Sequence, residues 1–342
     1  MAVTLQKSGY HGIFLPEADV VLDGTPPRSR KSRSGDESEF HVFISHAHSD
    51  HAPRSRRIPV YATPATADLI RARGHKGPVR EVPFGESICL PKARVTLYPA
   101  GHILGSAMIF VETDSGSLLY TGDCRTPPSP VTEGFALPDR VVDELIVEAT
   151  FGLPLYKWAP YDELAGDIRR FVYDSLENGA TPVMLCYNLG KAQEVMHILG
   201  DTDPPVQVQI HPAGAELCRV YEKHGVPLGD WEPLDIETLP GKTLITPSNT
   251  LDSRQLRDIP NLRIAYVSGW ATLETRGAGM AADTLIPLSD HLDFFELLGL
   301  CRRIGPKNIH LTHSPNPDVA AWFLQQEGFR AGRLALEENR HE

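Results

Sequence analysis

The sequence lacks long apolar runs. No stretch of its 342 residues approaches the roughly 20 apolar positions that a helix needs to cross a bilayer. Its first residues also lack the charged start and apolar stretch of a secretory signal. We therefore expect a cytoplasmic protein that has no membrane partner.

Cysteine is also scarce. The five cysteines are scattered and form no CxxC pair, which argues against a disulfide framework and against a thiolate metal site. We expect them to be reduced and mostly packed in the core. Any metal ligands would then be imidazole and carboxylate groups.

Basic residues are few for a protein that binds nucleic acid. Lysine and arginine number 33 against 44 aspartate and glutamate residues, a formal net charge of -11, and polyanion binding usually depends on a basic surface. Two basic clusters occur locally, RSRKSR at residues 28–33 and RSRR at residues 54–57. They are either solvated loops or a rim that faces phosphates, and the sequence leaves both interpretations open.

The chain divides into regions of different periodicity. Its 41% of apolar residues is enough to bury a core. In the first part, short β-type segments separated by Gly, Pro and charged residues predict a sheet-rich sandwich. From about residue 160, the alternation of PYDELAGDIRRFVYDSLENG, TPVMLCY and GKAQEVMHILG predicts a small α/β unit with parallel strands.

Histidines are concentrated in ISHAHSDH, directly after an apolar segment. His46 and His48 are two residues apart on an extended chain, so their imidazoles point to the same side and can reach one ion. Asp50 and His51 follow and can serve a neighbouring ion. A histidine-rich surface loop is the alternative interpretation, and ligand-type residues further along the chain count against it.

Three such residues follow other apolar β-type segments: His102 in PAGHILGSA, Asp123 in LLYTGDCRT and His313 in IHLTHS. A lone histidine after a strand is more often packed or solvated than a ligand, whereas four strand ends of this kind together indicate a metal centre. Imidazole and carboxylate ligands suit Zn²⁺, with Mn²⁺ or Fe as alternatives. Asp123 has the character of a bridge between two ions.

These motifs resemble those of the metallo-β-lactamase fold hydrolases. HxHxDH at residues 46–51, the GH that ends at His102 and the TGD that ends at Asp123 match the family in order. The resemblance implies an αββα sandwich that binds two metal ions at one edge. It also implies that Asp23, in DVVLDG, supports the metal-binding loop, although Asp23 taken alone would more often be a turn residue.

Three further motifs resemble the β-CASP nucleases within that superfamily. They are Glu148 in LIVEATFG, His291 in PLSDHLD and His313 in HLTHS. The resemblance implies an α/β fold in which a metallo-β-lactamase domain, residues 1–152 and 286–342, carries an inserted small α/β domain, residues 153–285.

Phosphodiester hydrolysis is compatible with these residues. The reaction needs a strong nucleophile, cations that neutralise developing charge, and an acid for the departing oxygen. Water that bridges two metal ions would be the nucleophile, with Asp50 as both a ligand and a catalytic residue. His291 would be the general acid, oriented by Glu148. A buried structural ion pair is the alternative interpretation of these two residues.

Within that family the chain most resembles the bacterial exonucleases encoded beside DNA ligases, which are similar to mRNA 3′-end processing factors. HAHSDH, PAGHILGSA, EATFGLPLYKW, LGKAQE and PLSDHLDFFELL carry this similarity over most of the chain. It implies nucleic acid as substrate, DNA rather than RNA, a link to repair and contact with a DNA ligase. Lys191 in LGKAQE would bind a phosphate at a helix start, and a solvated lysine is the alternative.

The chain departs from this pattern at two places. After SGW it has ATLETRGAGMAAD with Arg276 as the only basic residue, where the resemblance predicts an arginine-rich stretch, and Ser314 stands where glycine is usual. Neither is an expected ligand. A nuclease acting on DNA or RNA, a hydrolase of lactones, thioesters or cyclic nucleotides, and an inactive scaffold remain open, and so does the oligomeric state.

Overall fold

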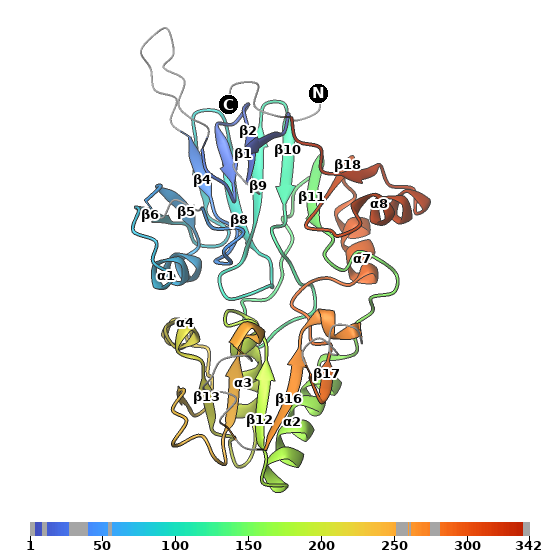
Figure 1. Cartoon of the computed structure of the whole chain (residues 1–342). Helices are drawn as coiled ribbons and strands as arrows, with labels where there is room; N and C mark the ends of the chain where they lie inside the picture. The colour runs from blue at the N-terminus through green and yellow to red at the C-terminus, as the bar shows by residue number, and fades with distance from the viewer. Residues whose placement is uncertain are drawn as a thin grey trace. The chain divides into compact units, whose positions relative to one another are not determined.

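The structure is a computed structural model that describes residues 4–8, 12–26, 40–53, 57–250, 259, 261–273 and 281–337. The chain forms two compact units, whose elements are drawn in Figure 1. Unit 1 comprises Met1–Pro128, Thr132–Leu155 and His291–Glu342, and unit 2 comprises Ser129–Val131 and Tyr156–Asp290. The basic clusters at residues 28–33 and 54–57, except Arg57, lie outside the described residues, as does Arg276.

The described residues of unit 1 form two β-sheets, of which the first has six strands. In spatial order they are β1 (Gln6–Ser8), β2 (Gly12–Leu15), β3 (Val20–Leu22), β4 (His41–Phe43), β5 (Val60–Ala62) and β6 (Val79–Glu81). The first three strands run antiparallel, and β3 to β6 run parallel. Helix α1 (Pro64–Ala72) connects β5 to β6 and begins at Thr63, whose side chain accepts a hydrogen bond from the Thr66 N–H.

The second sheet of unit 1 has seven strands. In spatial order they are β19 (Ala331–Arg333), β18 (Asn308–Thr312), β11 (Glu144–Glu148), β10 (Gly116–Tyr120), β9 (Ala107–Thr113), β8 (Arg94–Pro99) and β7 (Ser87–Cys89). Strands β18, β11 and β10 pair in parallel. The carboxyl ends of these three strands therefore lie at the same edge of the sheet.

Residues of the second sheet alternate between two cores, as the period of two in a strand requires. Leu118 and Tyr120 belong to a core that includes residues of both sheets, whereas Leu119 belongs to a core formed with helices α7 (Phe294–Ile304) and α8 (Pro317–Gln326). Figure 1 shows these two helices beside β18 and β11. The predicted α/β fold, with two packed sheets and outer helices, is confirmed.

Unit 2 contains a six-stranded sheet in which every described pair of strands is parallel. In spatial order the strands are β14 (Trp231–Pro233), β13 (Val208–Ile210), β15 (Thr243–Thr246), β12 (Thr181–Leu185), β16 (Leu262–Val267) and β17 (Thr284–Ile286). Its described helices are α2 (Tyr161–Glu177), α3 (Lys191–Gly200) and α4 (Pro212–Lys223), with 3₁₀ turns at Ser248–Thr250 and Gly269–Thr272. The predicted parallel α/β unit is therefore confirmed.

In neither unit does a described helix combine the length and apolar character needed to cross a bilayer.

Gly122 lies where the chain leaves β10, and its surroundings exclude a larger residue. Its φ is +55°, and an added Cβ would lie 2.7 Å from both Cβ and Oγ of Ser45. We predict that Gly122→Ala lowers the free energy of unfolding by about 2–4 kcal/mol, because backbone strain adds to the displacement of Ser45. Urea unfolding measures this loss.

Gly85→Ala is the matched control. Its φ is +79°, but no described atom lies within 4 Å of the added Cβ, so only the backbone strain applies. Equal losses of stability in the two variants would contradict the prediction.

Candidate metal centre

Strand ends bring the predicted residues of unit 1 together. Glu148 ends β11, whereas Asp123 and His313 follow the neighbouring strands β10 and β18. The turn between β8 and β9 carries His102, and the loop after β4 carries the HxHxDH residues. These segments are far apart in the sequence, but their ligand-type atoms converge into overlapping groups.

One cluster combines three imidazoles with a carboxylate. His46 Nε2 and His102 Nε2 both lie 3.1 Å from His48 Nδ1, and Asp123 Oδ2 lies 3.7 Å from His46 Nε2. Zn–N bonds are about 2.0–2.1 Å long, so two nitrogens on one tetrahedral ion lie roughly 3.3 Å apart. The ring nitrogens are therefore spaced as ligands of a single ion.

A second cluster shares Asp123 and adds His51 and His313. Asp123 Oδ2 lies 3.4 Å from His51 Nε2, and Asp123 Oδ1 lies 3.8 Å from His313 Nδ1. His51 Nε2 and Asp123 Oδ1 are buried and have no hydrogen-bond partner among the described residues. Such buried polar atoms are costly unless something else compensates them. Their spacing and their donor set fit a divalent cation, so the two clusters together could hold two ions.

Asp50 lies at the exposed edge of the second cluster. Its Oδ2 atom is 3.9 Å from His51 Nε2, and its side chain is 51% exposed. The Asp123 side chain, in contrast, is 8% exposed. Asp50 is therefore placed where it can contact both an ion and a substrate.

Asp23 lies behind His51 and holds its other ring nitrogen. Its carboxylate is 2.8 Å from His51 Nδ1 and accepts hydrogen bonds from the Ser45 N–H, the Ser45 hydroxyl and the Tyr120 hydroxyl. Burial, followed by the charge of Asp23, raises the pKa of Tyr120 well above its usual value, so this hydroxyl keeps its proton. With Nδ1 engaged, His51 presents Nε2 to the cluster, which is the geometry expected for support of a ligand.

Two members of this network are missed by sequence reasoning. Ser45 directly precedes the HxHxDH motif, and that position is the signal that could have suggested a role for it. Tyr120 carries no such signal, because only its burial against Asp23 shows that its hydroxyl is part of the site.

Protonation states in the clusters differ from those of isolated side chains. Burial, followed by the nearby His51 and His102, holds the pKa of His46 well below its usual value, so His46 is neutral. Burial opposes a proton on His51 as well, but Asp123 and Asp23 outweigh it and raise the pKa of His51 well above its usual value. The same pairing holds the pKa of Asp123 well below its usual value despite burial.

Glu148 and His291 form an ion pair next to the first cluster. Glu148 is fully buried, and its Oε1 atom lies 2.8 Å from His291 Nδ1. The His291 side chain is 19% exposed, and its ring centroid is 4.6 Å from that of His102. The pair is thus adjacent to a predicted ligand, and its histidine remains accessible to solvent.

Lys191 begins α3, as the sequence predicts, but its ammonium group is buried. The side chain is 2% exposed, and Nζ lies 2.8 Å from Glu194 Oε2 and 3.7 Å from Asp290 Oδ1. A phosphate at this position would compete with two carboxylates for the same ammonium. The predicted phosphate contact therefore gains no support from these neighbours and stays a prediction.

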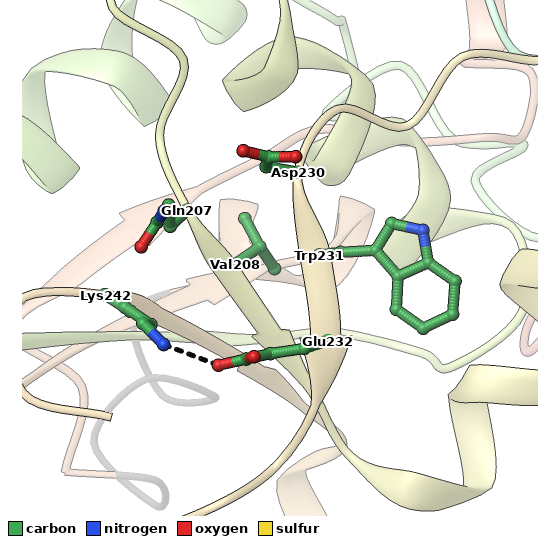
Figure 2. Close-up of a pocket in the computed structure, with 6 residues that line it drawn as sticks. All are labelled: Gln207, Val208, Asp230, Trp231, Glu232 and Lys242. Atoms are coloured by element: carbon green, nitrogen blue, oxygen red, sulfur yellow. Dashed lines mark hydrogen bonds and ion pairs between the residues drawn. The ribbon is translucent and has the colours of Figure 1, made fainter. Parts of the chain in front are cut away.

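A cavity of about 230 Å³ in unit 2 is lined by Gln207, Val208, Asp230, Trp231, Glu232 and Lys242. Figure 2 shows the Lys242 ammonium directed at Glu232, with Nζ 2.5 Å from Oε1. The Trp231 indole points away from Lys242, and its Nε1–H donates to Glu222. Because the cation is neutralised and Asp230 adds negative charge, this lining does not favour a polyanion.

His51 carries a proton that a metal ion must displace, which makes metal binding pH-dependent. Because the pKa of His51 is raised, each fall of one pH unit below that value weakens the apparent affinity of the second cluster by up to about tenfold. Zinc titration by calorimetry at neutral pH, in two buffers of different ionisation enthalpy, is expected to show the released proton.

Asp23→Asn provides the comparison for this titration. It removes one of the charges that raise the pKa of His51, so fewer protons should be released. Zinc binding to the wild-type chain without proton release would contradict the prediction.

Several known proteins are similar to this chain over half or more of its length. No family model matches the chain. The chain is 34% identical over 324 residues to a protein named probable DNA ligase from Opitutus terrae, which covers 94% of this chain and 30% of that protein. It is 28% identical to an RNase J-like protein from Methanocaldococcus jannaschii, over 53% of this chain and 49% of that protein. RNase aCSPSF2 from Saccharolobus solfataricus is 26% identical over 52% of this chain and 41% of that protein.

The chain thus spans less than half the length of these three curated relatives. A solved structure, described as a protein of unknown function from Enterococcus faecalis V583, matches 98% of this chain and 97% of that chain with a TM-score of 0.65 and 14% identity. That likeness shows the fold alone. By its relatives, as its motifs predict, the chain belongs to the β-CASP metallo-β-lactamase nuclease family.

Proposed function

We propose that the chain is a two-metal phosphodiesterase that hydrolyses nucleic acid, acting in the cytoplasm as a DNA exonuclease linked to repair. One observation carries the proposal. In unit 1, two imidazole–carboxylate clusters that share Asp123 lie next to the pair formed by Glu148 and His291. Sites for two cations beside a proton donor fit the two-metal mechanism of phosphodiester cleavage.

Zinc is the proposed cofactor, with manganese or iron as alternatives. Two such ions, when bound, would supply Lewis-acid stabilisation of the negative phosphate and activation of water at neutral pH. The residues that would hold them are the imidazoles and carboxylates gathered at the strand ends: His46, His48, Asp50, His51, His102, Asp123 and His313. Asp23 orients His51 through Nδ1, and the exposed carboxylate of Asp50 can accept a hydrogen bond from the attacking water.

His291 is the proposed general acid. Glu148 accepts the hydrogen bond from Nδ1 and stabilises the imidazolium, so proton exchange with the substrate falls to Nε2. As the bond between phosphorus and the leaving oxygen breaks, that oxygen takes the Nε2 proton and departs as a hydroxyl. Solvent can then reprotonate the ring, which is partly exposed. The buried charge of Glu148 acts strongly because little water screens it.

DNA is the proposed polymer because of the extent of the matches. The protein named probable DNA ligase matches 94% of this chain, whereas the two relatives named as RNases match 53% and 52% of it. We further propose a DNA ligase as partner, because the matched segment makes up 30% of a protein that carries that name. RNA is the second candidate, favoured by the two RNase names.

The general-acid role predicts a loss of rate without a loss of metal. His291→Ala and Glu148→Gln are each expected to lower kcat by about 10²- to 10⁴-fold, because proton transfer to the leaving oxygen is lost or misaligned. Neither residue is a proposed ligand, so metal content should stay unchanged. Steady-state assays on end-labelled DNA and elemental analysis of the same samples measure both quantities.

His310→Ala is the matched control for this comparison. His310 Nε2 also lies 2.8 Å from a carboxylate, that of Glu144. Glu144 lies at the start of β11, at the opposite end of the strand from Glu148. This variant should retain the wild-type kcat. A similar loss of kcat in the control would refute the assignment of His291 as the acid.

The choice of polymer is tested with end-labelled single-stranded and double-stranded DNA and RNA of matched sequence. We expect the zinc-loaded protein to shorten DNA from one end in single-nucleotide steps, and to leave RNA less affected. Asp123→Asn, which alters the shared ligand, is the control for contaminating nucleases. Cleavage of RNA alone would show that RNA, not DNA, is the substrate. Cleavage of no polymer would overturn the nuclease proposal.

A further inference from the structure

Both oxygens of the Glu148 carboxylate have their own hydrogen-bond partners. Oε1 lies 2.8 Å from His291 Nδ1 and accepts the backbone N–H of Cys124 at 3.0 Å. Oε2 accepts two hydrogen bonds from Thr150, one from its backbone N–H at 3.3 Å and one from its hydroxyl at 2.6 Å. Thr150 thus contacts the oxygen that His291 does not use.

We propose that Thr150 is a positioning residue for the general acid, a role that rests on the proposed function of His291. Its hydroxyl fixes the rotation of the Glu148 carboxylate so that Oε1 faces His291 Nδ1. The terminal torsion of a glutamate is broad, so the side chain alone does not fix the rotation of the carboxylate plane relative to the histidine ring. The contacts at Oε2 restrict that rotation.

The hydroxyl is the stronger of the two contacts that Thr150 makes. A 2.6 Å separation lies in the range of charge-assisted O–H···O⁻ bonds, which are roughly twice as strong as neutral ones. The N–H at 3.3 Å is beyond the usual distance for N–H···O bonds. Without the hydroxyl, Oε2 would keep only this weak contact, and the carboxylate would rotate more freely.

Water cannot take the place of the hydroxyl where a methyl group fills the same volume. Glu148 has no exposed surface and Thr150 is half-buried, so a water molecule could donate to Oε2 only in a variant that leaves space at position 150. Threonine is also suited to the position because its β-branch restricts χ1 and thereby the direction of the hydroxyl. The burial of Glu148 and the restricted hydroxyl of Thr150 therefore both support a positioning role for Thr150.

Two variants separate the hydroxyl from the shape of the side chain. Thr150→Val replaces the hydroxyl by a methyl group of similar volume, whereas Thr150→Ser keeps the hydroxyl and removes the methyl group. We expect Thr150→Val to lower kcat on nucleic acid by about 10- to 100-fold, the usual effect of losing an orienting partner, with KM and metal content unchanged. Thr150→Ser should retain most of the wild-type kcat. If Thr150→Val does not fold, Thr150→Ala is compared with Thr150→Ser, from which it differs by the hydroxyl oxygen alone.

A measurement without substrate tests the same inference independently. In the zinc-loaded 342-residue chain labelled with ¹⁵N-histidine, the His291 Nδ1–H resonance can be assigned by its loss in His291→Gln. We expect this proton downfield, as in a hydrogen bond to a carboxylate, in the wild type and in Thr150→Ser. It should move upfield or broaden in Thr150→Val.

These outcomes distinguish the inference from the function on which it rests. A wild-type chain that cleaves no nucleic acid would overturn the proposed function, and the resonance would still report on the alignment of His291. A His291 resonance that is unchanged in Thr150→Val would overturn the positioning role whatever the activity. Lower stability in Thr150→Val with an unchanged resonance and unchanged kcat would identify Thr150 as merely structural.

Discussion

The site depends on one buried carboxylate that several imidazoles share. Asp123 Oδ2 faces ring nitrogens of His46, His51 and His102, and Oδ1 faces that of His313. A buried carboxylate needs compensating positive charge, because water no longer solvates it. In the chain without metal, protonated His51 supplies that charge. The same geometry could hold cations once that proton leaves, and metal binding would then compete with protonation for one position.

Two residues of the site have backbone conformations that most residues avoid. Asp23 and His313 both have a φ of 49°, in the left-handed region that costs non-glycine residues roughly 1–2 kcal/mol. Such strain persists where surrounding contacts determine the conformation. For Asp23 these contacts are its hydrogen bonds to Ser45, Tyr120 and His51. The hydrogen bonds of Asp23 and its strained backbone are therefore two aspects of one network.

The sequence was sufficient for those features that depend on neighbouring residues. The alternation of segments from about residue 160 predicted the α/β unit, and apolar segments followed by histidine or aspartate predicted ligands at strand ends, whose side chains the structure brings together. Features that depend on distant partners were not predictable in this way. Tyr120 reaches Asp23 across 97 positions in the sequence, and no local pattern marks its hydroxyl. Lys191 was correctly placed at a helix start, but its carboxylate neighbours were not foreseen.

The sequence by itself determined the fold class, the family and the chemical character of the site, because periodicity, side-chain type and motif order are written along the chain. Only the tertiary structure decided which atom of each group meets which partner. In the structure, His51 Nδ1 contacts Asp23, and Lys191 is buried against Glu194. One oxygen of Glu148 contacts His291, and the other contacts Thr150. The physical reason is that burial and charge depend on what surrounds an atom, and segments far apart in the sequence supply most of those surroundings.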